Sequence, residues 1–233
     1  MSGNHKTLYL NTLPNAEAGT LLILCQDSYQ KRNMINPWKG MWLQPRQAIR
    51  TAIEEERENE MYLLTVLGGL ITGFDNLSDQ GIGDTMILPF ILLLWLIAGC
   101  FGGFISLYVV AGLLRWTGSW FGGKASFREL QFTYAWSFIP LLPSLGVVVI
   151  LIGYYGRSMF SSEGPAISGS IIDMVLLGGA FIIIVVLTLW AVVSFFRALS
   201  EVQAFNIWKA LGSVIIPFLG LIAIFAGIGF LMK

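Results

Sequence analysis

The chain has 233 residues, of which 55% are hydrophobic and only 12% are charged, and its formal net charge is zero. Soluble domains carry about 25% charged residues, so a globule of this composition would have too little polar surface to stay in solution. The neutral balance also argues against a nucleic-acid partner, because nucleic-acid-binding domains need a strongly basic surface. Composition therefore predicts an integral membrane protein.

Residues 1–35 form a polar segment with two short apolar stretches, Leu8–Leu10 and Leu21–Cys25. Pro14 and Gly19 separate the two stretches, which favours either a small hairpin or loosely ordered chain. The segment has no short apolar core followed by a cleavage site, so we expect no cleavable secretory signal. We interpret it as a cytoplasmic N-terminal segment.

Residues 36–60 predict an amphipathic helical region at the membrane surface. Trp38, Met41 and Trp42 share one helical face, and Pro45 suits the first position of a second helix. After Pro45, apolar residues recur on one side of that helix, namely Ala48, Ile49, Ala52 and Ile53. The helix pair either lies on the inner leaflet or docks on the cytoplasmic loops, and the two arrangements do not exclude each other.

A membrane-spanning helix needs about 20 mostly apolar residues. Four runs are long enough: Thr85–Val110, Tyr134–Tyr155, Ile171–Phe196 and Leu211–Met232. A fifth run, Met61–Leu77, is shorter and richer in glycine, and it is interpreted as a true span in preference to a re-entrant segment. The expected fold is all-α, with five spans that follow the amphipathic region.

The distribution of positive charge supports five spans. With the N-terminus in the cytoplasm, 12 of the 14 Lys and Arg residues fall on the inner side: Lys6, Lys31, Arg32, Lys39, Arg46, Arg50, Arg57, Arg115, Lys124, Arg128, Arg197 and Lys209. Only Arg157 and Lys233 fall outside, as the positive-inside rule requires. Without the first span, the basic N-terminal region and the loop around Lys124 would lie on opposite faces. The C-terminus is therefore expected outside.

Small residues and prolines recur along the spans. Gly69 with Gly73, and Gly99 with Gly103, form Gly-x-x-x-Gly pairs, which allow two helices to approach closely in lipid. Packing within the chain is the favoured use of these glycines, and a homo-oligomer is the alternative. Four prolines should kink spans or break their hydrogen-bond ladders, namely Pro89, Pro140, Pro143 and Pro217.

Catalytic and metal-binding patterns are missing from the sequence. The one histidine, His5, lies in the N-terminal segment, and Cys25 and Cys100 are far apart in different settings. We therefore expect no catalytic pair, no disulfide, no metal site and no cofactor. No ionisable residue falls at the midplane of a span, since Asp173 and Arg197 lie near the ends of theirs. This weakens the case for ion-coupled transport.

The most suggestive loop feature is Ser126 followed by Glu129, which predicts a capping box that starts a helix before the third span. Lys124 and Arg128 flank it. These residues serve either as a helix cap with charges that fix topology, which is favoured, or as a contact for lipid headgroups or a partner.

Several blocks resemble the bacterial branch of the YIP family. Asn36-Pro37-Trp38, Met41-Trp42, Pro45-Arg46 and Ile49-Arg50 resemble the segment that leads into that family's spans. Further matching blocks follow in order and cover residues 36–233: Gly112–Leu114 before Gly122–Glu129, Tyr134–Ser137 up to Pro140, Trp190 before Phe195 and Ala198–Leu199, and Glu201–Phe205 running into Trp208–Leu211.

The resemblance implies one domain over residues 36–233, with five helical spans, a cytoplasmic N-terminus and a location in the cell membrane. The family is named for eukaryotic relatives that bind Ypt/Rab GTPases in membrane trafficking. This chain lacks their long acidic N-terminal region and their Asp-Leu-Tyr-Gly-Pro motif, in whose place stands Arg57-Glu58-Asn59-Glu60. Rab binding is therefore not expected, and the bacterial branch implies no particular activity.

Together these features predict a non-enzymatic scaffold or adaptor at the inner leaflet, which contacts membrane lipids and a protein partner. The candidate contact residues are Trp38, Trp42, Pro45, Arg46, Lys124, Phe127, Arg128, Glu201 and Phe205. The alternative is a carrier of lipids or small solutes that uses the kinked, glycine-rich spans. The carrier interpretation predicts a cavity that opens to one leaflet or one face.

Overall fold

A computed structural model describes residues 35–204 and 206–216. The chain divides into two compact units, Met1–Asn36 and Pro37–Lys233. The helices described here belong to the second unit. The expected hairpin, His5 and Cys25 lie outside the described residues. Where the second unit is described, its elements are helical, and the one β-type pairing is an isolated bridge between Ile82 and Ser161.

The helices follow one another in the order α3 Pro37–Leu43, α4 Pro45–Glu54, α5 Glu58–Asp79, α6 Leu88–Trp120, α7 Phe127–Trp136, η1 Ile139–Leu141, α8 Leu142–Tyr155, η2 Gly156–Phe160, α9 Ile171–Val202 and a short apolar helix, Ile207–Ile216. Among the described residues, three segments are long and apolar enough to cross a membrane: Leu88–Trp120, Phe127–Phe160 and Ile171–Val202. The all-helical class is thus confirmed.

The predicted first and last spans are not among these three segments. The 22 residues of α5 begin with Glu58 and Glu60 and end at Asp79, which leaves a short apolar stretch between polar ends. The last predicted span, 211–232, lies mostly outside the described residues.

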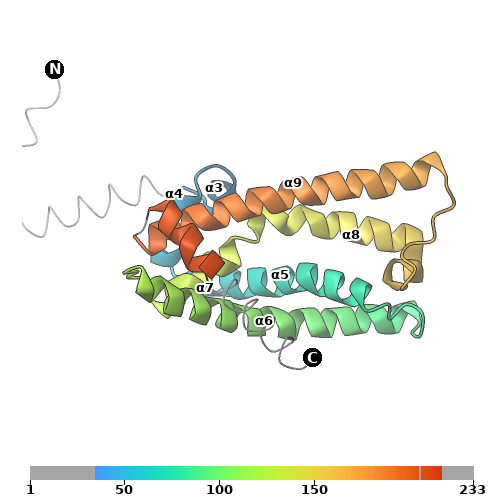
Figure 1. Cartoon of the computed structure of the whole chain (residues 1–233), viewed down its shortest axis with the longest axis horizontal. Coiled ribbons are helices and arrows are strands. Elements are labelled where there is room, and N and C mark those ends of the chain that lie inside the picture. The colour runs from blue at the N-terminus through green and yellow to red at the C-terminus, as the bar shows by residue number, and fades with distance from the viewer. Residues whose placement is uncertain (1–34, 205, 217–233) are drawn as a thin grey trace, which may run out of the picture. The chain divides into compact units, whose positions relative to one another are not determined.

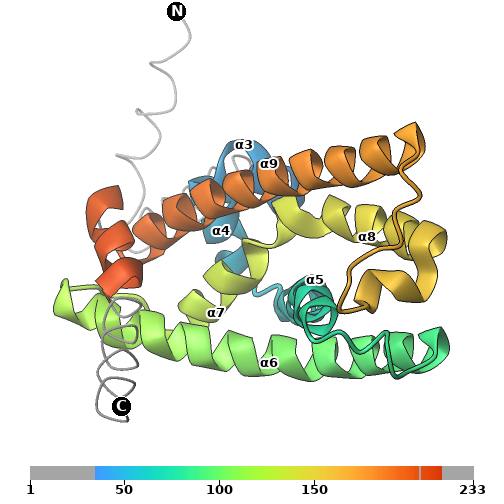
Figure 2. The same cartoon turned by 45° about the vertical axis from the view of Figure 1, so that its right-hand side comes forward.

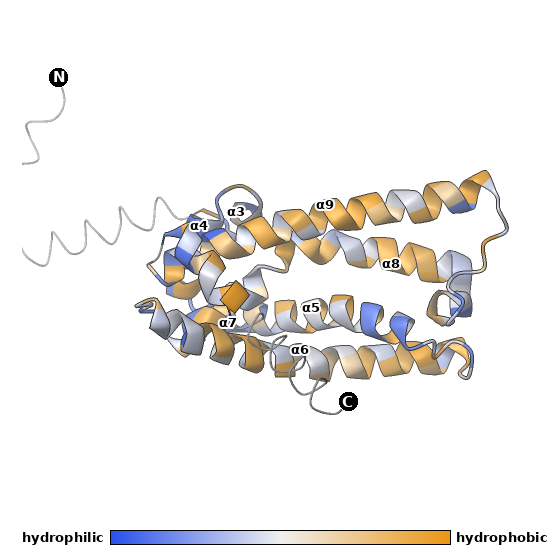
Figure 3. Ribbon diagram, viewed as in Figure 1, coloured by the Kyte–Doolittle hydropathy of each residue, from blue (hydrophilic) through white to orange (hydrophobic). Residues whose placement is uncertain are grey.

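The four longest helical segments of this unit run back and forth between two ends (Figures 1 and 2). One end carries α3, α4, α7 and residues 121–126, and we name it the α4 end. The opposite end carries residues 80–87 and 156–170. Every described Lys and Arg except Arg157 lies at the α4 end. Between these two ends, the residues along the middle of α6, α8 and α9 are mostly apolar (Figure 3).

Glycines allow α5 and α6 to pack in close contact. A Cβ added to Gly69 would lie 2.7 Å from the Cα of Gly103, and one added to Gly103 would lie 2.5 Å from the carbonyl oxygen of Thr65. A Cβ added to Gly73 would likewise lie 3.3 Å from the Cα of Gly99. Packing within the chain is therefore confirmed. Self-association through the same glycines stays a prediction, and it would require α5 and α6 to separate.

Prolines break the third predicted span, as expected. Pro140 lies in the 3₁₀ helix η1, and Pro143 occupies the first turn of α8, so residues 134–155 form two α-helices with a 3₁₀ turn between them. Pro89 behaves differently, because it stands in the first turn of α6 and starts that helix without kinking it. Pro217 lies outside the described residues.

Two helices extend beyond the predicted spans. The prediction ended the second span at Val110, whereas α6 continues to Trp120, and α9 continues past Phe196 to Val202. The end of α6 is set by Gly122, whose φ of +80° favours glycine, and by a hydrogen bond from the amide of Gly123 to the carbonyl of Gly118 at 2.9 Å. The added turns belong to the α4 end.

A polar clasp joins the two loops at the opposite end. The Asp84 carboxylate accepts hydrogen bonds from the hydroxyls of Ser161 and Ser162, both at 2.5 Å, and from the Ser162 amide at 3.2 Å. These bonds, led by the one from Ser161, lower the pKa of Asp84 below its ordinary value. The amide of Gly83 also donates to the Phe160 carbonyl, at 2.6 Å. The two loops are therefore held together by specific contacts.

Candidate functional site

Helices α3 and α4 dock on the bundle through an apolar face. Met41, Ala48, Ile49 and Ala52 are fully buried, and α4 begins at Pro45 as predicted. The structure thus shows α3 and α4 packed against helices of the bundle, and a position on the inner leaflet stays a prediction.

Polar contacts fix α3 and α4 to α9. The hydroxyl of Ser194 donates to the Met41 carbonyl at 3.2 Å, and the indole N–H of Trp190 donates to the Trp42 carbonyl at 3.1 Å. Arg50 of α4 forms an ion pair with Glu201 near the end of α9. A helix hairpin tied down at several points is a fixed part of the bundle.

The two tryptophans of α3 have different surroundings. Trp38 donates its indole N–H to Glu60 at 2.5 Å, and its ring meets the buried Trp136 edge-to-face, with centroids 5.8 Å apart. Trp38 therefore contributes to internal packing. Trp42 is half-buried and lines a groove on α9.

That groove, here the α9 groove, has a volume of about 270 Å³. Its lining comes from the end of α3, the start of α4 and one face of α9: Trp42, Pro45, Val186, Leu189, Trp190, Val193, Ser194 and Arg197. Arg46 is exposed beside it and reaches the Ser200 hydroxyl at 3.5 Å, a long hydrogen bond. Trp190 and Arg197 were not among the contact residues predicted from the sequence. Their spacing along α9 with Val186 and Val193 is the helical-face pattern that could have identified them.

The loop before α7 carries the predicted capping box. The Ser126 hydroxyl accepts from the Glu129 amide at 3.2 Å, and the Ser126 amide donates to the Glu129 carboxylate at 2.6 Å. Phe127 is half-buried and stacks on Tyr108, with centroids 6.2 Å apart. The capping box is therefore confirmed, and it fixes where α7 begins.

The two basic residues near this loop differ in their contacts, because Arg128 is paired with glutamates and Lys124, among the residues described, is not. Arg128 bonds to Glu58 at 2.5 Å and to Glu56 at 3.5 Å, so α7 is tied to the turn between α4 and α5. Lys124 is exposed and forms no ion pair within the described part of the chain.

The candidate residues thus form two groups at the α4 end. Trp42, Pro45, Arg46 and Glu201 lie around the end of α9. A second group, beside the turn between α4 and α5, comprises Lys124, Phe127 and Arg128. Trp38 is half-buried and packs against Trp136, and Phe205 lies outside the described residues.

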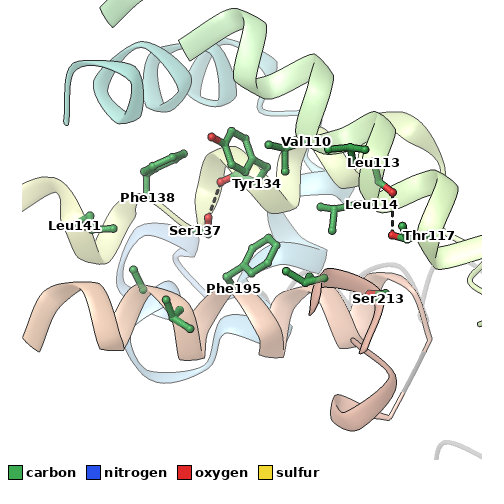
Figure 4. Close-up of a pocket in the computed structure, with 13 residues that line it drawn as sticks. Val110, Leu113, Leu114, Thr117, Tyr134, Ser137, Phe138, Leu141, Phe195 and Ser213 are labelled. Atoms are coloured by element: carbon green, nitrogen blue, oxygen red, sulfur yellow. Dashed lines mark hydrogen bonds between the residues drawn. The ribbon is translucent and has the colours of Figure 1, made fainter. Parts of the chain in front are cut away.

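A second hollow, here the inner cavity, has a volume of about 350 Å³ (Figure 4). It lies between α6, the α7–η1 segment, α9 and the helix Ile207–Ile216, and its lining is Val110, Leu113, Leu114, Thr117, Tyr134, Ser137, Phe138, Leu141, Ala191, Val192, Phe195, Ser213 and Val214. The hydroxyls of Thr117, Ser137 and Ser213 donate to carbonyls of their own helices, at 2.6–2.8 Å. Their donor hydrogens are used locally and most of the other lining residues are apolar, so the cavity suits an apolar guest.

Acidic and cysteine residues do not gather into a metal site in the part of the chain that the structure describes. Asp173, buried at the start of α9, accepts hydrogen bonds from the Tyr155 hydroxyl at 3.0 Å and the Ser168 hydroxyl at 2.6 Å. The Ser170 hydroxyl caps the same turn by accepting from the Asp173 amide. Asp173 thus joins α8 to α9.

Comparison with known proteins gives one match. A family model described as the Yip1 domain matches residues 39–228. No curated protein and no solved structure matches the chain. Members of the matching family are in general non-enzymatic membrane proteins. Because the match covers most of the sequence, this chain belongs to the Yip1 domain family and is a multi-pass membrane protein.

Proposed function

We propose that this protein is a non-enzymatic adaptor or scaffold that presents the α4 end of its bundle to a protein partner at the inner leaflet. The observation that carries the proposal is the docking of α3 and α4, whose apolar face is buried and whose polar face is left exposed. A hairpin fixed in this way holds its exposed side chains in a constant arrangement. Such preorganisation reduces the entropy cost of binding.

The proposal includes the orientation of the chain in the membrane. Five spans, a cytoplasmic N-terminus and an outer C-terminus would put the α4 end in the cytoplasm of the cell. The gathering of described Lys and Arg at that end supports this orientation. The 22 residues of α5 extend about 33 Å, so the helix can cross the hydrocarbon core if its polar ends reach the headgroup layers on both sides of its shorter apolar stretch.

Charge at the α4 end indicates the kind of partner. Arg50 and Arg128 are paired with glutamates of the same chain. Lys39 and Lys124 are exposed and form no ion pair among the described residues. Two cations without counterions favour a partner with an acidic surface, since complementary charge raises both association rate and specificity.

The test is purification of the intact protein in mild detergent, with co-purifying proteins and lipids identified by mass spectrometry. We expect a protein partner in near-stoichiometric amount. The double variant Lys39→Glu with Lys124→Glu should lower its recovery at least about tenfold, because two attractive contacts become repulsive. The matched control is Arg157→Glu, a charge reversal at the opposite end, which should retain the partner. Equal recovery from all three proteins would refute the adaptor proposal.

The inner cavity favours a second candidate, a carrier of lipids or small apolar solutes. Its lining is mostly apolar, and three of its hydroxyls already donate their hydrogens to nearby carbonyls, which suits a hydrocarbon guest. In the same purification, one enriched lipid or small molecule without a protein partner would favour the carrier. Its retention should then fall in Val192→Trp, which fills the cavity.

A further inference from the structure

We propose that the α9 groove binds one phospholipid with an anionic headgroup, whose phosphate pairs with Arg197 and whose acyl chain lies against α9. The site does not depend on the adaptor role or on the orientation of the chain. It requires only that α9 crosses the membrane with its Arg197 end at one surface.

The walls of the groove suit an acyl chain. Val186, Leu189 and Val193 line it and are 57%, 62% and 47% exposed. In a multi-pass membrane protein, an exposed apolar helix face contacts the hydrocarbon of the bilayer. The groove volume of about 270 Å³ lies slightly below the range of about 300–1,000 Å³ for small-molecule pockets. It therefore accommodates part of one chain, and the rest continues along α9.

Arg197 supplies the charge that a phosphate needs. It lies one turn beyond Val193, where the exposed apolar face of α9 ends. The carboxylate nearest along the helix, Glu201, is engaged by Arg50. Within the described ranges 35–204 and 206–216, Arg197 forms no ion pair of its own, although it is exposed. An arginine without a counterion at the end of an apolar helix is complementary to a phosphate group.

Two tryptophans, Trp42 and Trp190, also line the groove. Because the indole N–H of Trp190 is already donated to the Trp42 carbonyl, what this ring adds to the lining of the groove is apolar surface. Tryptophan rings are enriched at the headgroup layer of membranes. The order along α9 is thus an apolar face, then tryptophan, then a free cation, which matches the order of chain, interface and phosphate in a phospholipid. A free anion would need the cation alone.

Native mass spectrometry of the full chain in dodecyl maltoside tests the site. The probes are phosphatidylglycerol and phosphatidylcholine with identical acyl chains, and inorganic phosphate. We expect one tightly held phosphatidylglycerol, with phosphatidylcholine bound more weakly and no displacement by millimolar phosphate. Arg197→Gln should weaken phosphatidylglycerol at least about tenfold, through loss of a charge-assisted hydrogen bond. Arg197→Lys should weaken it only a few-fold.

Matched variants separate the site from general effects. Arg115→Gln removes another exposed arginine at the α4 end and should keep the lipid. Val193→Trp fills the groove and should abolish binding, whereas Val175→Trp adds the same bulk to an exposed position elsewhere on α9 and should not. Equal binding of the two lipids, or equal loss in Arg197→Gln and Arg115→Gln, would overturn the proposal. Displacement of the lipid by inorganic phosphate would overturn it too, because the site would then bind a free anion.

Discussion

Gly69→Val is expected to prevent α5 and α6 from packing and to lower the stability of the protein by about 3 kcal/mol or more, at the upper end of overpacking effects. The reason is geometric, since a Cβ at this position would meet the backbone of Gly99 and Gly103 and not a side chain that can move. The helices would have to separate along their length. Melting in detergent, followed by size-exclusion chromatography with fluorescence detection, measures the loss.

Gly102→Val is the matched control for this prediction. It carries the same change in helix propensity in the same helix pair, but no atom lies within 4 Å of the Cβ that it adds. Its melting temperature should stay within a few degrees of the unaltered protein. If both variants melt together, close packing of glycines does not hold α5 to α6.

Ile49→Asp is expected to release α3 and α4 from the bundle. Ile49 is fully buried on the docking face of α4, where a carboxylate would replace an apolar side chain in an apolar environment. Burial of an unpaired charge costs several kcal/mol, so the released arrangement of α4 becomes favoured over the docked one. We expect cleavage by trypsin after Arg46, Arg50 and Arg57 to accelerate at least about tenfold, while the spans stay folded.

Gln47→Asp introduces the same side chain on the exposed face of α4 and should leave the cleavage rate unchanged. Comparable acceleration in both variants would mean that charge alone loosens α4. Unchanged cleavage in Ile49→Asp would mean that docking does not depend on this apolar face.

Local features of the fold could be predicted because they depend on neighbouring residues. The Ser126–Glu129 capping box and the start of α4 at Pro45 each follow from a few adjacent positions. The buried face of α4 and the break at Pro140 follow in the same way. The ends of α6 and α9 could not be predicted from hydropathy, which measures an apolar length. A helix continues as long as its backbone hydrogen bonds do.

The candidate site was predicted less completely, because its contacts join distant parts of the chain. Spacing put Trp38 and Trp42 on one face, but Trp38 is held by contacts with Glu60 and Trp136, which lie far along the chain. Glu201 lies four residues after Arg197 on α9, but its carboxylate pairs with Arg50 of α4. Arg197 is therefore left free by a contact that no local pattern contains.

The proposed function depends most on the orientation of the α4 end and on the number of spans. Both are tested by single cysteines at Lys39→Cys, Ser162→Cys and Lys233→Cys, in a chain in which Cys25 and Cys100 are replaced by serine. The cells are treated with a membrane-impermeant maleimide before and after permeabilisation. We predict that Ser162→Cys and Lys233→Cys react in intact cells, and that Lys39→Cys reacts only after permeabilisation. Reaction of Lys39→Cys in intact cells, or protection of Lys233→Cys, would contradict five spans with the α4 end in the cytoplasm.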